Sequence, residues 1–339
     1  TMFPLMMLIM NVITILIVWV GAHQIDSGII QVGDMMAFIQ YTMQIIMAFL
    51  MISMTSIMLP RASVAAGRID EVLNVKPTIL DPENPKQFDG NLKGNIKFKR
   101  VSFKYPDADK YVIKNISFEA KAGETTAFIG GTGSGKSTIV NLIPRFYDVT
   151  EGYITIDGID IRDVTQHDLC DRIGYVSQKG ILFTGTIASN LKHGKEHASE
   201  EEMKEAAKTA QALDFIMKKE KQFKEEIAQG GTNVSGGQKQ RLSIARALIK
   251  KPDIYIFDDT FSALDFKTDA ALRKALSKTT KESTVLIVAQ RINTIMNADK
   301  IIVLDNGRIV GMGKHEELLK NCKVYKEIAL SQLSKEELA

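Results

Sequence analysis

Formal charge is almost absent from the first 60 of the 339 residues, where Asp26 and Asp34 are the only charged side chains. The same stretch holds 11 of the 15 methionines. Averaged over the chain, 45% apolar and 24% charged residues with a net charge of +3 would describe an ordinary soluble protein. The uneven distribution excludes a uniformly soluble chain and indicates two different parts that meet near Arg61.

The chain also has only two cysteines and no large excess of one charge sign. Cys170 and Cys322 are far apart and have no paired spacing, so reduced thiols are favoured over a disulfide or a metal site. Residues 61–339 have a net charge of only +5, which excludes the footprint of a nucleic-acid-binding protein. The composition also excludes disordered and collagen-like chains.

Two membrane spans are predicted, at about residues 2–21 and 35–60, because a charge-free helix of about 20 residues crosses the hydrocarbon. The intervening loop lacks Lys and Arg, whereas Arg61 and Arg68 follow the second span. This predicts an integral protein of the cell membrane with its loop outside and both ends in the cytoplasm. A pair of buried core helices is the alternative, and a signal peptide is disfavoured by the absence of a basic start.

The chain begins with Thr1 and enters apolar sequence at once. Two helices cannot enclose a polar path through a bilayer, although they could anchor a cytoplasmic domain. We therefore expect a longer chain with further spans upstream.

Residues 61–75 continue the second span with a helical pattern, and residues 76–93 contain three prolines. Proline disfavours helix before it, so the second segment is predicted to be a linker. From residue 94 to 321, β-rich runs alternate with helical patterns, which predicts an α/β domain. Strands are expected at 95–103, 125–129, 173–176, 254–257, 284–288 and 300–304, and the mixed-charge run 218–226 is expected to be a solvated helix face.

A glycine-rich loop follows the second predicted strand and precedes an apolar helix expected at 139–146. Successive backbone N–H groups at a helix N-terminus bind phosphate, and the glycines permit the tight turn. Lys136 is expected to reach the outer phosphates, and the Ser137 hydroxyl to ligate magnesium. The predicted ATP-binding residues of the loop are Gly130, Gly131, Thr132, Gly133, Ser134, Gly135, Lys136, Ser137 and Thr138.

A second element of the site is the apolar strand that ends in Asp258. In a phosphate-loop nucleotidase such an aspartate lies beside the loop and holds magnesium. An apolar strand that ends in aspartate is weak evidence for a magnesium ligand by itself, and strong evidence in a chain that also has the glycine-rich loop.

The segment Val234-Ser235-Gly236-Gly237-Gln238 offers a second anion site at a helix N-terminus. Here the chain resembles the ATP-binding cassette family, whose signature sequence is Leu-Ser-Gly-Gly-Gln. The resemblance implies that Ser235, Gly236, Gly237 and Gln238 close on ATP held by a second cassette packed head to tail.

The resemblance extends to further residues. It implies that adenine stacks on Tyr105, that Gln178 reaches the magnesium and the attacking water, and that Asp265 belongs to a loop crossing the dimer interface. The run 182–187 and the fused membrane segment are similar to those of exporters. The implied fold is an α-helical transmembrane hairpin followed by an α/β P-loop cassette domain, with a helical subdomain at about 186–250 and a C-terminal helix at 322–339.

Two positions depart from the family pattern. Asp259 stands where the family has a catalytic glutamate. The aspartate side chain is one methylene shorter, which withdraws the carboxylate by about 1.5 Å. Gln290 replaces a histidine that contacts the γ-phosphate, and an amide cannot shuttle a proton. Each change alone is compatible with tolerated drift; together they favour ATP binding without efficient hydrolysis, because misplacement of about 1 Å can cost about 100-fold in rate.

These features predict one subunit of a heterodimeric exporter of a small or amphipathic molecule such as a drug, lipid or peptide. The expected cofactors are ATP and Mg²⁺. The expected partners are a second half-transporter, membrane lipid and the transported molecule, without nucleic acid. A homodimer with slow ATPase and a membrane-anchored ATP sensor are the alternatives. The two spans disfavour a soluble cassette ATPase.

Overall fold

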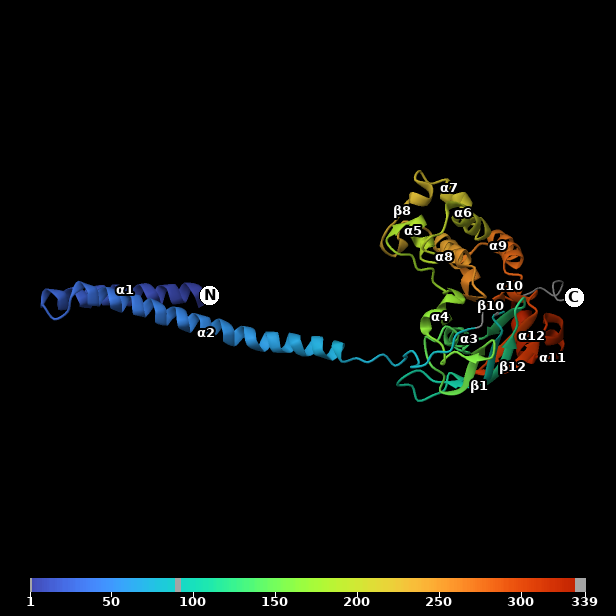
Figure 1. Cartoon of the computed structure of the whole chain (residues 1–339), viewed down its shortest axis with the longest axis horizontal. Coiled ribbons are helices and arrows are strands. Elements are labelled where there is room, and N and C mark those ends of the chain that lie inside the picture. Colours follow the sequence, from blue (N-terminus) through green and yellow to red (C-terminus); the bar gives the residue numbers. More distant parts are fainter. Residues whose placement is uncertain (1, 89–92, 333–339) are drawn as a thin grey trace. The chain divides into compact units, whose positions relative to one another are not determined.

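The computed structural model describes residues 2–88 and 93–332, in two compact units, Thr1–Thr78 and Ile79–Ala339 (Figure 1). The first unit contains α1 (Met2–Asp26) and α2 (Val32–Leu73), and α1 lies against the N-terminal part of α2 (Figure 1). A Cβ at Gly21 would lie 2.9 Å from Cγ of Met35, so a glycine permits the close approach of the two helices. Pro60 lies inside α2, which ends two residues before the predicted limit of the helical pattern.

Both helices are long and apolar enough to cross a membrane, and their side chains are almost entirely exposed. A core helix of a soluble protein would instead be buried. At 42 residues, α2 extends about 63 Å, roughly twice the hydrocarbon thickness.

The described part of the predicted linker contains neither helix nor strand, but its second half is docked on the second unit. Asp81 Oδ1 accepts a hydrogen bond from the backbone N–H of Gln166 (2.7 Å), at the start of α4 (Gln166–Asp171). The Lys86 ammonium pairs with Asp163 at 2.7 Å. Asp81 and Lys86 of this segment therefore lie on the surface of the second unit.

The second unit contains a six-stranded sheet in the order β12-β11-β3-β10-β9-β6, in which only the edge strand β12 is antiparallel to its neighbour. Its strands are β3 (Thr125–Gly130), β6 (Ile173–Val176), β9 (Ile254–Asp258), β10 (Thr284–Val288), β11 (Lys300–Asp305) and β12 (Arg308–Gly313). The strands β9 and β10 are buried throughout, as expected of parallel strands covered on both faces.

A four-stranded antiparallel sheet in the order β2-β1-β4-β5 packs on this core. Its strands are β1 (Ile96–Phe103), β2 (Ile113–Ala120), β4 (Glu151–Ile156) and β5 (Ile159–Asp160), and β7 (Gly185–Thr186) pairs separately with β8 (Glu226–Ile227). All six predicted strands are confirmed within one residue at each end, whereas β2, β4 and β12 were not predicted.

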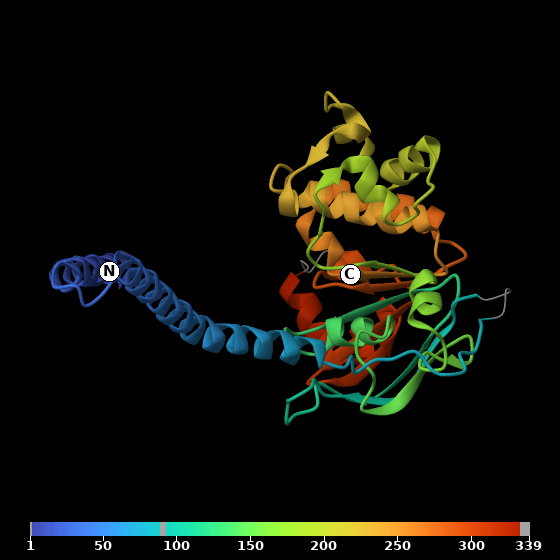
Figure 2. The same ribbon diagram turned by 60° about the vertical axis from the view of Figure 1, so that its left-hand side comes forward.

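Helices α5 to α8 gather in a helical lobe (Figures 1 and 2), and their buried residues share one core with the six-stranded sheet. They are α5 (Ile187–Lys192), α6 (Glu200–Thr209), α7 (Leu213–Met217) and α8 (Gly236–Lys250). The remaining helices are α3 (Lys136–Leu142), α9 (Phe266–Thr279), α10 (Ile292–Ile295), α11 (His315–Asn321) and α12 (Lys323–Gln332). Residues 333–339 of the predicted C-terminal helix lie outside the described residues.

Two helix predictions are corrected. The run 218–226 forms a short 3-10 turn and the start of β8, because Phe223 is buried and Glu226 pairs with Thr186 in the β7–β8 ladder. The helix after the glycine-rich loop begins at Lys136 and ends at Leu142, earlier than the predicted range 139–146.

Candidate nucleotide-binding site

The glycine-rich loop joins β3 to α3, as its sequence predicts. Gly133 (φ 78°) and Gly135 (φ 98°) adopt the left-handed backbone region that glycine favours. A Cβ at Gly135 would also lie 2.7 Å from Cγ2 of Ile113, whereas a Cβ at Gly131 or Gly133 would meet no atom within 4 Å. One side of the loop is thus packed on the sheet and the other is open to a ligand.

The Lys136 ammonium lies over this loop. Its Nζ donates hydrogen bonds to the backbone carbonyls of Gly130 and Gly131, both at 2.8 Å. Burial lowers the pKa of Lys136, while the charges of Asp259 and Asp258 oppose this effect. The open N–H groups and this cation make the loop suitable for polyphosphate.

Ser137, near the start of α3, lies next to Asp258, the last residue of β9. The Ser137 hydroxyl donates to Asp258 Oδ1 at 2.9 Å. Burial raises the pKa of Asp258, and the Ser137 hydrogen bond opposes this shift. A hydroxyl and a carboxylate at this spacing fit Mg²⁺, which prefers oxygen ligands.

No cluster of three or more His, Cys, Asp or Glu side chains that could hold a metal occurs among the described residues. The residues that would supply oxygens to Mg²⁺ are Ser137, Asp258 and the Gln178 amide. Nucleotide phosphates and water commonly complete such a coordination shell.

Asp259 is the point where three predicted catalytic residues come together. Its Oδ2 accepts hydrogen bonds from the side-chain amides of Gln290 (2.7 Å) and Gln178 (3.1 Å). Asp259 has a left-handed backbone (φ 44°) and is 7% exposed. Burial raises its pKa, and the amide bonds oppose that shift because they stabilise the carboxylate.

Tyr105 lies beside the loop helix, as its predicted contact with adenine requires. Its hydroxyl is 3.1 Å from Thr138 Oγ1, and its ring packs edge-on against Phe103 and Tyr147. The tyrosine is thus held next to α3, and adenine stacking stays a prediction.

The signature residues begin α8 in the helical lobe. Ser235 Oγ accepts from the N–H of Gln238 (3.3 Å), and Gln238 Oε1 accepts from the N–H of Ser235 (3.0 Å). Asp265 similarly caps α9 through the N–H of Thr268 at 3.0 Å. Among the hydrogen bonds of the described residues, none joins Ser235 or Asp265 to the glycine-rich loop, and the role of both residues at a second nucleotide stays a prediction.

Two polar residues of the site were missed by sequence analysis. The hydroxyl of Tyr175 on β6 donates to Asn141 Oδ1 on α3 (2.7 Å) and lies 3.5 Å from Asp258 Oδ2. Burial raises the pKa of Tyr175, so it stays a neutral donor. No local motif marks either residue, since their contacts depend on the packing of β6 against α3.

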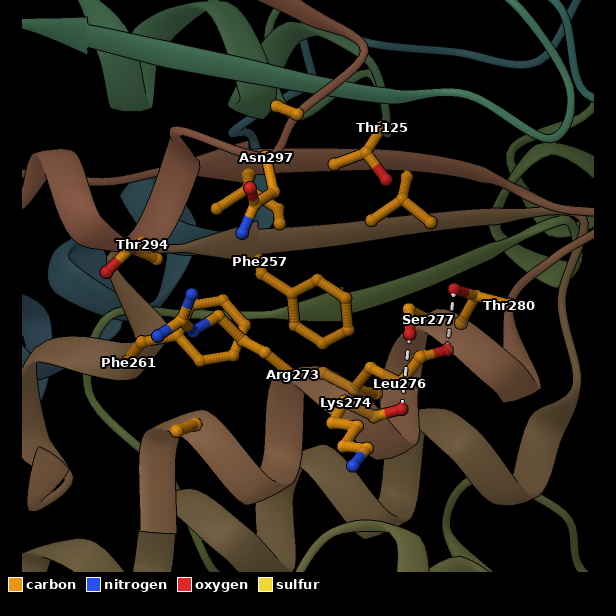
Figure 3. Close-up of a pocket in the computed structure, with 14 residues that line it drawn as sticks. Thr125, Phe257, Phe261, Arg273, Lys274, Leu276, Ser277, Thr280, Thr294 and Asn297 are labelled. Carbon is orange, nitrogen blue, oxygen red and sulfur yellow. Dashed lines mark hydrogen bonds between the residues drawn. The ribbon is translucent and has the colours of Figure 1, made fainter. Parts of the chain in front are cut away.

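A cavity of about 320 Å³ lies elsewhere in the second unit, between the sheet and α9 (Figure 3). Phe257 and Phe261 form part of its wall, and the guanidinium of Arg273 is engaged by Asp269 and the Asn293 carbonyl. None of its lining residues belongs to the predicted nucleotide site.

Comparison with known proteins agrees with this geometry. Residues 113–262 match the family described as ABC transporter. An uncharacterized ABC transporter ATP-binding protein of Mycobacterium tuberculosis is 47% identical over 334 residues, covering 98% of this chain and 57% of the relative. An ATP-dependent lipid A-core flippase of Desulfotalea psychrophila is 39% identical over 317 residues, covering 94% and 55%.

Among solved structures, a bacterial Atm1-family ABC exporter with ATP bound gives a TM-score of 0.83 at 33% identity, covering 98% of this chain and 58% of that one. The fold and the site define an ATP-binding cassette. Over 98% of its length, the chain is similar to ATP-binding proteins of ABC transporters and to an ABC exporter of known structure. It spans slightly more than half the length of the curated relatives it matches.

Proposed function

We propose that this chain is one subunit of an ATP-driven exporter, with its cassette in the cytoplasm and its two apolar helices in the cell membrane. The apolar helices and the cassette belong to one chain, which supports export. The names of two relatives support a small or amphipathic cargo: the lipid A-core flippase, and a putative multidrug export protein of Bacillus subtilis that is 36% identical.

We further propose that the subunit's own site holds MgATP and hydrolyses it poorly. The supporting observation is the environment of Asp259, whose Oδ2 is shared by two neutral amides, Gln178 and Gln290. An amide donates hydrogen bonds but cannot take up a proton at neutral pH. The short carboxylate is therefore engaged by amides and has no imidazole beside it to assist a reacting water.

The signature supports a role at another subunit's nucleotide. Ser235 and Gln238 form the complete N-terminal cap of α8. A Cβ at Gly236 would meet no atom within 4 Å, so there is open space beside this end of the helix. In the proposed heterodimer, Ser235 to Gln238 complete the hydrolytic site built on the partner's glycine-rich loop. Two ATP molecules would close the cassettes, and hydrolysis at the partner's site would reset them.

The proposal predicts a gain of activity in the purified chain. Asp259→Glu with Gln290→His restores a longer carboxylate and an imidazole, and should raise MgATP turnover by about 10- to 100-fold. The measurement is phosphate release from the full chain in detergent micelles, with Lys136→Ala as the control that removes the phosphate contact. Fast turnover by the unmodified chain, or no gain in the double variant when a second cassette supplies its signature residues, would contradict the weakly hydrolytic site.

A further inference from the structure

The last described residue of the chain reaches the site from the other end of the sequence. Gln332, at the end of α12, accepts a hydrogen bond at Oε1 from the backbone N–H of Ile292 (2.9 Å). Its Nε2 donates to the backbone carbonyl of Gln290 (2.8 Å). One side-chain amide therefore holds both ends of residues 290–292, as a neighbouring β-strand would. We call these two hydrogen bonds the Gln332 pair.

The packing of α12 fixes the position of Gln332. Tyr325 and Ala329 are fully buried, and a helix places residues i, i+4 and i+7 on one face, so Gln332 continues this face at the exposed end of the helix. The Tyr325 hydroxyl is also hydrogen-bonded to Nδ1 of His315 at 2.7 Å. The amide is thus carried on an anchored element.

Residues 290–292 need this support because α10 lacks a local cap. Ile292 is the first residue of α10, and Arg291 at the N-cap makes no side-chain hydrogen bond to the helix. Gln332 supplies that missing acceptor. On the other side, the N–H of Ala289 donates to the Phe128 carbonyl of β3 at 3.1 Å.

We propose that Gln332 is a positioning residue of the nucleotide site. Through residues 290–292 it holds the Gln290 side chain where its amide donates to Asp259 at 2.7 Å. The C-terminal helix thereby sets the geometry at the end of the site nearest the outer phosphate. The link to that phosphate rests on the proposed function, whereas the Gln332 pair itself does not.

Hydrogen exchange of the full chain in micelles, without nucleotide, tests the pair directly. Gln332→Ala should speed exchange of the Ile292 amide by about fivefold, since a net hydrogen bond contributes about 1 kcal/mol. Gln332→Glu retains the acceptor for Ile292 and should have a smaller effect. Lys326→Ala, at an exposed position on the same helix, is the matched control. Unchanged exchange in Gln332→Ala would overturn the proposal.

Nucleotide binding tests positioning against a merely structural role. Gln332→Ala should weaken MgATP binding about fivefold and leave MgADP binding unchanged, because only ATP presents the outer phosphate. In the Gln290→Ala background the same change should have no further effect. Equal losses for ATP and ADP, or additive losses, would overturn the positioning role. Failure of the proposed function would appear separately, as no gain of turnover in the Asp259→Glu, Gln290→His variant.

Discussion

The carboxylate of Asp258 lies at the end of β9 with 5% of its surface exposed, hydrogen-bonded to Ser137 and near Tyr175. Burial raises its pKa, so the folded chain keeps a proton at pH values where the unfolded chain has lost it. The free energy of unfolding therefore falls as the pH rises from the ordinary value of 3.8 through the raised pKa. A metal ion would compensate the buried charge.

Asp258→Asn should reduce this pH dependence, since the raised pKa of Asp259 contributes in the same direction, and should weaken the stabilisation by magnesium. With EDTA and no nucleotide, the variant should be at least as stable as the unmodified chain above the raised pKa. With MgATP at about 100 times Kd, the unmodified chain should gain about 2.7 kcal/mol and the variant clearly less. Thermal unfolding at several pH values, with ATP in EDTA as the control, measures both effects. An equal gain from MgATP in both chains would contradict a magnesium role.

Residues of the site differ in how far the sequence predicts them. The phosphate-binding residues of the loop, including Lys136 and Ser137, are adjacent in sequence, so a single motif predicts them. Asp258 is predicted because it ends an apolar strand in a chain that also has a phosphate-binding loop, beside which such an aspartate lies. Tyr175 and Gln332 are not predictable in this way, because their partners lie 83 and 42 residues away and depend on packing.

At the scale of the element, Ser235 has two separable roles. Its reciprocal hydrogen bonds with Gln238 cap α8, and its hydroxyl is expected to face a partner's phosphate. The cap affects the stability of α8, whereas the expected phosphate contact depends on the charge of the side chain at position 235.

Two substitutions separate these roles. Ser235→Ala should lower the stability of the helical lobe by about 1 kcal/mol, whereas Ser235→Asp keeps a capping oxygen and should be nearly neutral. Ser235→Asp should nevertheless impair ATP-dependent assembly more than Ser235→Ala, because its carboxylate repels phosphate. Hydrogen exchange at the start of α8 and nucleotide-dependent dimerisation are the measurements. Normal assembly of the Ser235→Asp variant would argue against a phosphate contact.

Five of the six predicted strands are apolar runs of the central sheet, which is why their bounds hold; the sixth, β1, lies in the antiparallel sheet. The missed strands β2, β4 and β12 each contain two or more exposed residues and pair antiparallel, so their apolar signal is diluted. The run 218–226 has helix-forming charges, but burial of Phe223 overrides that local preference. Tertiary contacts decide such elements.

At the scale of the whole molecule, the proposed asymmetry requires a second chain. We expect co-purification from native membranes with a half-transporter that has glutamate and histidine where this chain has Asp259 and Gln290. In that assembly Asp259→Ala should leave most substrate-stimulated ATPase and ATP-dependent vesicle uptake intact, while Ser235→Asp should abolish them. Mass spectrometry of the complex identifies the partner. Loss of turnover in Asp259→Ala, or capture of a second copy of this chain alone, would contradict the heterodimer.

Pro60 gives α2 a local mechanical property. Proline has no N–H, so one rung of the helical ladder is missing there, and stiffness against bending is lowest at this point. The helix continues about 20 Å beyond it to Leu73, and a 10° bend at Pro60 would displace that end by about 3 Å. Strain imposed on either end of α2 therefore concentrates near Pro60, about two-thirds of the way along the helix.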